Sequence, residues 1–466
     1  MVIGGRFQDL QNLISVITRP KIANTVHAST SSVRTAFAGN LIVLMIFLAS
    51  TSAMAEMRSL TLGQAMAIAM EQNRDIEKAR EYAKYVQGKY VEERAAALPQ
   101  LALNGSAILT QDDSQKVLAT LAPREHTRAI DLTLSQPLFT WGKVSAAIRA
   151  AEVGLKTADE QLRLYRQAAY RDVTTAFYDI LLARELNNLA MENLAQKQRL
   201  LDESKRRYEA GVATDYDVLA AEVAVENARP EVIRTKNSVR TVRERLRFLL
   251  ALDKDEVDAV GSLEAEVNVP KTYEDALATA RIRRPELGDL RYRIGIYREL
   301  VTIAAADNKP RLDLKGGVGW HWLDVRDSGV SGNADGAAWN IGVFFSFPFF
   351  DGLKTGGRVT QAKSDLRTRE IEEAKLLDSI ALDVRDSGNA VKEAAEIVQA
   401  LGGTVHQAER LLQMAEKGYE FGVKIKLEVD DAQLNLLQAR SNLARAQRDY
   451  RVAWANYEWA MGTAGE

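Results

Sequence analysis

The chain repeats its own landmarks at one fixed spacing, and this repeat constrains the fold more than any single motif does. Four landmarks recur 211 residues later without an insertion: Pro99 as Pro310, Pro137 as Pro348, Tyr208 as Tyr419 and Gly211 as Gly422. A fixed period across long and otherwise dissimilar segments indicates that one structural unit has been duplicated. We therefore predict two tandem modules, 56–264 and 265–466. Each is expected to contain a helical run, a strand pair and a long helix that turns back.

Composition excludes several classes of protein. A formal net charge of −2 over 466 residues gives no reason to expect nucleic acid as a partner. The absence of cysteine excludes disulfides, thiolate metal sites and a cysteine nucleophile. No phosphate-binding loop or Ser/His/Asp arrangement is present, so we predict no enzyme, no metal site and no cofactor. The few imidazole side chains are scattered: His27, His126, His321 and His406.

The beginning of the sequence is typical of an exported protein. The apolar run Leu41–Leu48 is followed by Ala53-Met54-Ala55, which suits signal peptidase cleavage. This run is too short for a membrane-spanning helix, which needs roughly 20 apolar residues. We interpret 1–55 as an N-terminal extension with a signal peptide, and no later segment could span a membrane as a helix.

Helical periodicity fills most of the rest of the chain. Apolar residues recur at three-and-four spacing, and a single helix over Val144–Tyr208 would be about 98 Å long at 1.5 Å per residue. Glycine marks the two turns, so each long helix is expected to lie antiparallel to the next, in a coiled coil that is broken or kinked near Pro230. The predicted helices are Leu62–Leu98, Val144–Tyr208, Asp215–Leu250, Tyr273–Asn308, Arg358–Tyr419 and Leu427–Met461.

Four segments alternate between apolar and polar residues with the period of a strand. We predict strands at about 100–110, 128–139, 311–323 and 338–349, with polar loops at Gln111–Thr127 and Asp324–Ala338. A two-sided sheet of a soluble protein would give the same alternation. Tryptophans near the ends of strands of about ten residues favour a transmembrane barrel. Two strand pairs cannot close a barrel in lipid, so oligomerisation is expected. The aromatic residues predicted to face lipid are Trp320, Trp322, Trp339, Phe345 and Phe347.

In this order and twice over, these residues resemble the TolC-like outer-membrane efflux family. The motifs are Leu62-Gly63-Gln64-Ala65, Gln136-Pro137-Leu138-Phe139 and the twice-repeated Tyr-Glu-x-Gly-Val at Tyr208 and Tyr419. The resemblance implies a homotrimer: a 12-stranded barrel in the outer membrane of a Gram-negative-type bacterium, continued by a periplasmic α-helical tunnel. It also implies a periplasmic adaptor protein and a proton-driven or ATP-driven inner-membrane pump as partners.

The resemblance implies that the second turn is the inner mouth of the tunnel. Tyr419, Lys424, Glu428 and Asp431 fall where the family has a tyrosine, an arginine and two aspartates, and Asp217 falls on the opposing acid. Comparing the modules, we predict that Asp215 and Asp217 pair with Lys424 and Lys426 of an adjacent hairpin and close the mouth. Glu428 and Asp431, tripled by symmetry, would form acidic rings that attract cations and raise some of their own pKa values. Solvated charges beside a turn are the plainer interpretation. The residues predicted to dock an adaptor are Gly211, Val212, Gly422 and Val423.

The predicted function is therefore the passive exit duct of a tripartite efflux system for small toxic compounds. Type I protein secretion uses similar ducts and is the alternative. A soluble periplasmic coiled-coil adaptor or scaffold would explain the helices, but it would not explain four amphipathic strands with aromatic residues at their ends.

Overall fold

The structure is a computed structural model that describes residues 58–111, 124–253, 256–264, 266–326 and 331–465. The predicted extension and signal peptide lie outside these residues, as do parts of the two predicted polar loops. Within the described ranges, no helix combines the length and the apolar character needed to cross a membrane.

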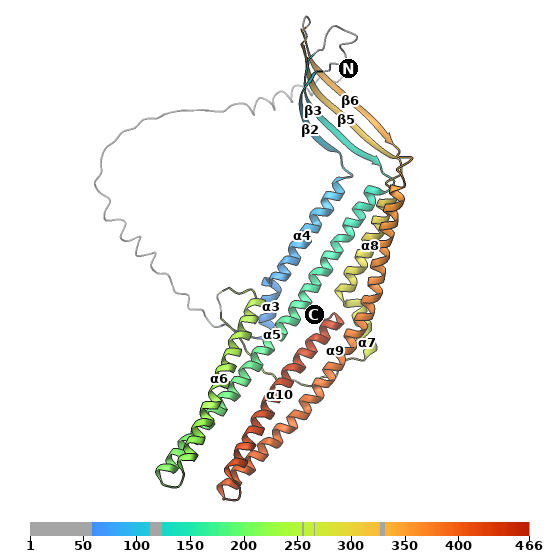
Figure 1. Cartoon of the computed structure of the whole chain (residues 1–466). Coiled ribbons are helices and arrows are strands. Elements are labelled where there is room, and N and C mark those ends of the chain that lie inside the picture. Colours follow the sequence, from blue (N-terminus) through green and yellow to red (C-terminus); the bar gives the residue numbers. More distant parts are fainter. Residues whose placement is uncertain (1–57, 112–123, 254–255, 265, 327–330, 466) are drawn as a thin grey trace, which may run out of the picture. The chain divides into compact units, whose positions relative to one another are not determined.

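Helices and strands follow one another in the same order in the two halves of the chain (Figure 1). The first half contains β1 (Arg58–Leu60), α3 (Leu62–Gln72), α4 (Arg74–Ala95), β2 (Gln100–Gln111), β3 (Arg124–Phe139), α5 (Lys143–Glu209) and α6 (Asp215–Leu249). The second half contains β4 (Val257–Ala259), α7 (Tyr273–Arg283), α8 (Pro285–Ala305), β5 (Arg311–Arg326), β6 (Ser331–Ser346), α9 (Lys354–Glu420) and α10 (Lys426–Met461). Elements α7, α8, β5, α9 and α10 each begin 211 residues after α3, α4, β2, α5 and α6. The spacing of the landmarks is therefore also the spacing of the elements.

Each helical run before a strand pair is two helices rather than the single helix that we predicted. Asn73 separates α3 from α4, and its side-chain oxygen accepts hydrogen bonds from the N–H groups of Asp75 and Ile76, at 2.9 and 3.3 Å. The same capping role explains why asparagine favours helix starts. In the second half the break falls at Arg284, where the extended backbone precedes Pro285 at the start of α8. The breaks lie at equivalent positions and change the direction of the chain in both halves.

The four long strands form one antiparallel sheet in the order β2-β3-β5-β6. Since directly paired residues lie on one face and faces alternate along a strand, the register gathers most of the large apolar side chains on a single face. Its members are Leu101, Leu103, Ile130, Leu132, Leu134, Leu312, Leu314, Val318, Trp320, Trp322, Trp339, Ile341, Val343 and Phe345. We call this the apolar sheet face. The opposite face carries Asn104, Asp131, Thr133, Lys315 and glycines, and the register leaves Ile108, Leu323 and Phe344 there as well.

The strands are longer at one end than the alternation predicted. Strand β3 begins at Arg124, β5 continues to Arg326 and β6 already begins at Ser331, inside the segments that we expected to be loops. The ladder uses main-chain groups, so polar side chains do not end it. At the other end β6 stops at Ser346, before Pro348, which has no N–H to donate.

The two long helices of each half form antiparallel hairpins, α5 with α6 and α9 with α10 (Figure 1). The predicted break in α6 is absent, since one helix runs through the exposed Pro230. Proline removes one internal hydrogen bond. Buried Val225 and Ala228 hold this part of α6 in place, and Val225 packs in a cluster with Leu201 of α5.

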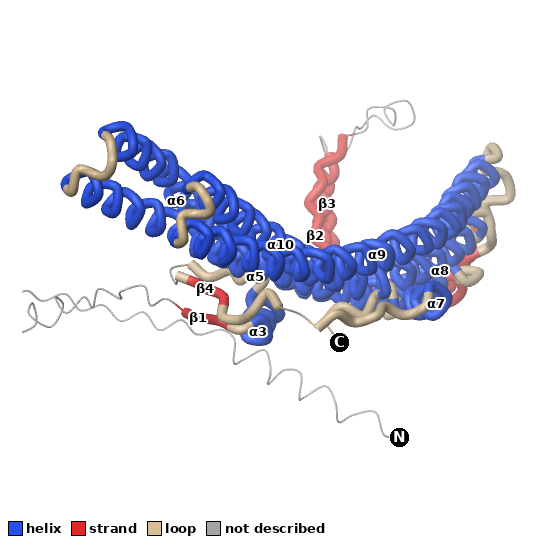
Figure 2. The backbone as a smooth tube through the Cα atoms, turned by 90° about the horizontal axis from the view of Figure 1, so that it is seen from below, coloured by secondary structure: helices blue, strands red, loops and turns tan. Residues whose placement is uncertain are grey.

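A hydrophobic core joins the short elements to the first hairpin. Figure 2 shows β1, β4 and α3 gathered on one side of α5. Strands β1 and β4 pair in parallel, and their Leu60 and Val257 are buried against Val173, Phe177 and Ile180 of α5. Because Leu60 precedes α3 and Val257 follows α6, this core fixes where α6 ends relative to α3.

A second core fixes the end of α10. The guanidinium of Arg284 is almost fully buried, at 4% side-chain exposure, and forms ion pairs with Glu286 (3.2 Å) and Asp383 (3.1 Å). The same cation lies 4.5 Å from the ring centre of Trp459, over which Arg171 of α5 also lies, at 5.0 Å. Paired charges are tolerated in a core when their hydrogen bonds are satisfied. Helices α5, α8, α9 and α10 are therefore joined at this point.

Candidate functional site

Both hairpins end in a tight turn built on glycine. Gly211 and Gly422 have φ of 75° and 72°, which side chains with a Cβ rarely adopt. In the first turn the N–H groups of Gly211 and Val212 donate back to α5, at 2.8 and 2.9 Å, and the second turn repeats this pattern at 3.0 and 2.8 Å. These bonds satisfy carbonyls at the helix end. The glycines are thus required by the turn itself.

At each turn a carboxylate caps the start of the helix that follows the turn, α6 or α10. Asp217 accepts hydrogen bonds from the N–H and the hydroxyl of Thr214, both at 2.8 Å, and these bonds lower the pKa of Asp217. Lys426 and Arg207 lower the same pKa further through their charges. At the other turn Glu428 accepts from the ammonium of Lys424 and from the N–H of Ile425, at 3.1 Å.

In the single chain, the nearest contacts of Lys424 and Asp215 lie within their own turns. Within the described chain Lys424 pairs with Glu428 of its own helix turn, and does not pair with Asp215 or Asp217. Asp215 instead hydrogen-bonds Tyr208, whose pKa it raises. Like-charge repulsion would raise the pKa of Glu428, but Lys424 and the Ile425 N–H lower it. The charge of Lys426 acts on Asp217 within the single chain, and the predicted closing of the mouth by these residues stays a prediction.

Polar contacts tie the two hairpins to one another, and of the residues that form them the sequence singled out only Tyr419. Arg207 of α5 donates a hydrogen bond to the hydroxyl of Tyr419 at 2.9 Å, directly beside both turns. Lys197 approaches Asp430 at 3.5 Å, and farther along α5 Asp179 accepts from Arg448 at 2.6 Å. One available signal was overlooked: the residue 211 positions after Arg207 is Gly418, so the modules differ in charge at this position. We call the Arg207–Tyr419 hydrogen bond the tip tie.

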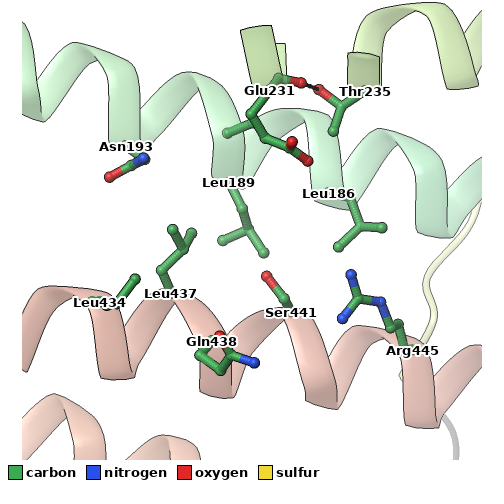
Figure 3. Close-up of a pocket in the computed structure, with 11 residues that line it drawn as sticks. Leu186, Leu189, Asn193, Glu231, Thr235, Leu434, Leu437, Gln438, Ser441 and Arg445 are labelled. Atoms are coloured by element: carbon green, nitrogen blue, oxygen red, sulfur yellow. Dashed lines mark hydrogen bonds between the residues drawn. The ribbon is translucent and has the colours of Figure 1, made fainter. Parts of the chain in front are cut away.

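Between these ties the hairpins are incompletely packed. A cleft of ≈ 270 Å³ lies between α5, α6 and α10, lined by residues that include Leu189, Leu437, Glu231 and Arg445. Figure 3 shows Leu189 of α5 and Leu437 of α10 pointing toward one another across it. Close packing would make this contact rigid. The cleft therefore leaves this part of the contact between the hairpins without close apolar packing.

The turns expose more apolar surface than the two predicted valines. Val212 is 71% exposed and Val423 is 80% exposed. Further large apolar side chains stand beside them in both turns: Tyr216, Leu219, Phe421, Ile425 and Leu427. Contiguous exposed apolar side chains on a protein mark contact surfaces.

The aromatic residues predicted to face lipid lie on or next to the apolar sheet face. Trp320 pairs with Ile130, and Trp339 pairs with Val318, so the sheet groups them with aliphatic side chains. Trp339 and Phe345 are 77% and 66% exposed in the single chain. Phe347 lies one residue beyond the end of β6.

We predict that the turns keep their carboxylates charged well into the acidic range. The pKa values of Asp217 and Glu428 are both lowered, so their capping contribution is complete above their ordinary pKa values and is lost only as the pH falls through the lowered ones. Hydrogen exchange at the starts of α6 and α10, corrected for the intrinsic rate, should show unchanged protection from about pH 7 to pH 5. Protection that disappears within this range would mean that like-charge repulsion dominates.

Three comparisons with known proteins agree with one another. A family model described as "Outer membrane efflux protein" matches residues 66–252 and 276–463. The chain is 23% identical over 381 residues to outer membrane protein TolC of Vibrio cholerae, which covers 80% of this chain and 84% of that protein. It is 25% identical over 339 residues to the alkaline protease secretion protein AprF of Pseudomonas aeruginosa, covering 72% and 69%. The crystal structure of the Campylobacter jejuni CmeC outer membrane channel matches with a TM-score of 0.75 at 18% identity, over 86% of each chain.

Proposed function

We propose that three copies of the chain assemble into one continuous duct. The chain belongs to the outer membrane efflux protein family and is an outer-membrane channel for efflux or secretion. The four strands of each copy would form a third of a 12-stranded barrel, and the helices would form the wall of a periplasmic tunnel. The observation that carries this proposal is the apolar sheet face, which runs across all four strands. The fold is that of TolC-like channels, mostly helical with some strands.

The unpaired edges of the sheet support closure by neighbouring copies, and the number three is what the resemblance to the family implies. In the single chain β2 and β6 each pair on one side only. Unpaired N–H and C=O groups cost several kcal/mol each in hydrocarbon, so an open four-stranded sheet would not persist in lipid. Pairing β6 of one copy with β2 of the next removes every edge. The face opposite the apolar sheet face would then line a water-filled lumen.

The duct would be passive and would take its energy from partners. An inner-membrane pump and a periplasmic adaptor would deliver cargo to the end formed by the two turns. The exposed apolar side chains there, with Val212 and Val423 foremost, would be the adaptor-docking surface. We propose small toxic compounds as cargo. Similarity to AprF, named for alkaline protease secretion, favours polypeptide secretion as the second candidate.

The charged residues of the turns would set the resting state of the entrance. The tip tie would hold the hairpins together, while Lys426 opposite Asp217 would add a screened attraction. Asp431 is exposed and has no ion-pair partner in the part of the chain that the structure describes, unlike Glu428. In a trimer Asp431 would therefore present three uncompensated carboxylates.

The test of the duct is single-channel recording of the purified protein in planar bilayers, after fractionation has located it in the outer membrane. Stable channels from a trimer are the expected result, together with hypersensitivity to toxic compounds when the protein is deleted. Folded protein that is extracted without detergent and forms no channels would instead support a periplasmic scaffold. A deletion that abolishes export of a polypeptide while drug sensitivity stays normal would support secretion.

We predict that the entrance carboxylates give the channel a preference for cations. Replacing Glu428→Gln together with Asp431→Asn should move the reversal potential in a salt gradient toward zero, because three copies lose six negative charges. The matched control is Asp75→Asn with Glu77→Gln, which removes the same charge at the start of α4. Unchanged selectivity of the first variant would remove the acidic rings from the mechanism.

A further inference from the structure

The strands join the long helices through a backbone conformation that side chains normally avoid. Trp141 and Gly142 precede α5 with φ of 47° and 82°. Gly352 and Leu353 precede α9 with φ of 66° and 67°. These pairs are equivalent, since each lies 211 residues from the other. Each junction thus consists of two consecutive left-handed residues, of which one is glycine and the other is large and apolar.

The exchange of positions between the two junctions shows that the large residues are not needed for the backbone. Glycine occupies the first position in one junction and the second position in the other, so the same conformation accepts glycine at both. A residue with a Cβ costs roughly 1–2 kcal/mol there. Trp141 and Leu353 are nevertheless 50% and 81% exposed, so burial within the chain does not compensate this cost. Strain held at such positions is typical of functional sites.

The two junctions share one pocket. It has a volume of ≈ 460 Å³ and brings Trp141 together with the 347–353 segment and with residues 308–310, which lie between α8 and β5. Apolar side chains form one part of its wall, with Phe347, Phe349, Phe350 and Leu353 beside Trp141, and Asn308, Lys309 and Asp351 form the polar part. Phe349 and Phe350 are 86% and 75% exposed. Such exposure of neighbouring aromatic side chains marks a contact with something outside the chain.

The pocket is lined by one cation and one carboxylate, Lys309 and Asp351. Asp307, the acid nearest in sequence to Lys309, is engaged by Lys143 at 2.6 Å and by Arg358 at 2.7 Å. Asp351 is used by the start of α9, where it accepts from an N–H at 2.9 Å. Lys309 lines the pocket, is exposed, and has no acidic partner within the described residues. Lys309 therefore has an ammonium group without an ion-pair partner in the described chain, next to exposed aromatic and aliphatic side chains, and this combination matches a phosphate attached to acyl chains.

We propose that the pocket binds an anionic phospholipid of the periplasmic leaflet, with the acyl chains on Leu353, Phe349 and Trp141 and the phosphate at Lys309. This rests on the proposed function, which places the apolar sheet face in lipid. The junction residues follow that face without interruption, since Phe347 comes directly after the end of β6. The site would fix the depth at which the barrel meets the tunnel.

The test is native mass spectrometry of the full-length protein released from detergent with phosphatidylglycerol or phosphatidylcholine. The unmodified protein should retain phosphatidylglycerol preferentially. Leu353→Gly should reduce this retention at least severalfold while raising the thermal midpoint, because glycine relieves the strain. Lys309→Gln should remove the preference between the two lipids without lowering the thermal midpoint.

The matched control is Ala251→Gly, which relieves a positive φ of 54° at the end of α6, away from the junctions. It should raise the thermal midpoint similarly and leave lipid retention unchanged. Equal retention in Leu353→Gly and the unmodified protein would overturn the proposal. So would dissociation of the oligomer in Leu353→Gly with lipid retained, because the residue would then face a second copy of the chain. Channel recordings of the unmodified protein test the duct separately.

Discussion

A chain with alanine in place of Gly462 is expected to lose most of its thermal stability. Gly462 ends α10 with φ of 73°, and a Cβ there would lie 2.6 Å from the carbonyl carbon of Arg283 and 2.7 Å from the nitrogen of Arg284. These are main-chain atoms at the break between α7 and α8, and they cannot move without displacing the buried Arg284 cluster. The left-handed φ costs about 1–2 kcal/mol, and overpacking adds about 1–3 kcal/mol.

The measurement is the thermal midpoint in detergent at one fixed scan rate. Gly465→Ala is the control, because it has a similar φ of 82° but its Cβ would meet only the ring of Tyr170, at 3.4 Å. It should shift the midpoint by the conformational cost alone. If the two variants melted together, the close approach of α10 to the α7–α8 break would not contribute to stability. The hydrogen bond from Gln167 to the Gly462 carbonyl, at 2.7 Å, should be lost with the first variant only.

Charge reversal at the tip tie is expected to open the channel. Arg207→Glu removes the hydrogen bond to Tyr419. It also places a carboxylate near Asp217 and Glu203, which attract Arg207 in the unmodified protein and would repel the new carboxylate. The site is half-exposed, so we assign each tie only about 0.5–1 kcal/mol. Three ties that break together give about 1.5–3 kcal/mol, a change of roughly 10- to 100-fold in the closed-to-open ratio.

The measurement is the resting conductance of single channels in planar bilayers. Arg206→Glu is the matched control, since Arg206 lies in the same last turn of α5, is exposed, and forms no ion pair within the described part of the chain. It changes the charge equally and should leave the conductance near that of the unmodified channel. If both variants raised conductance equally, general repulsion between the turns would explain the effect and the tip tie would have no special part. Tyr419→Phe should raise conductance less than Arg207→Glu, because no repulsion is added.

Several structural features could be predicted because their causes are local in sequence. The turn glycines follow from the backbone conformation of a helix end, and the faces of the strands follow from an alternation of two. The long helices α5 and α9 begin and end within a few residues of the prediction. The helix breaks were missed, although their signals were present: an asparagine cap at Asn73 and the proline after Arg284. Helical periodicity runs through both breaks and outweighed these single residues.

By itself, the sequence determined the order of the elements, their repetition at 211 residues, the apolar sheet face and the family. Only the tertiary structure decided which charged groups meet. Arg207 and Tyr419 are 212 residues apart, and Arg448 and Asp179 are 269 apart, so no local pattern connects them. In the single chain Lys424 forms an ion pair with Glu428, four residues away, and not with the acids of the other turn. An exposed ion pair is worth too little to position a helix. The packing of the hairpins therefore sets which side chains come within reach, and the charges pair with whatever lies nearest.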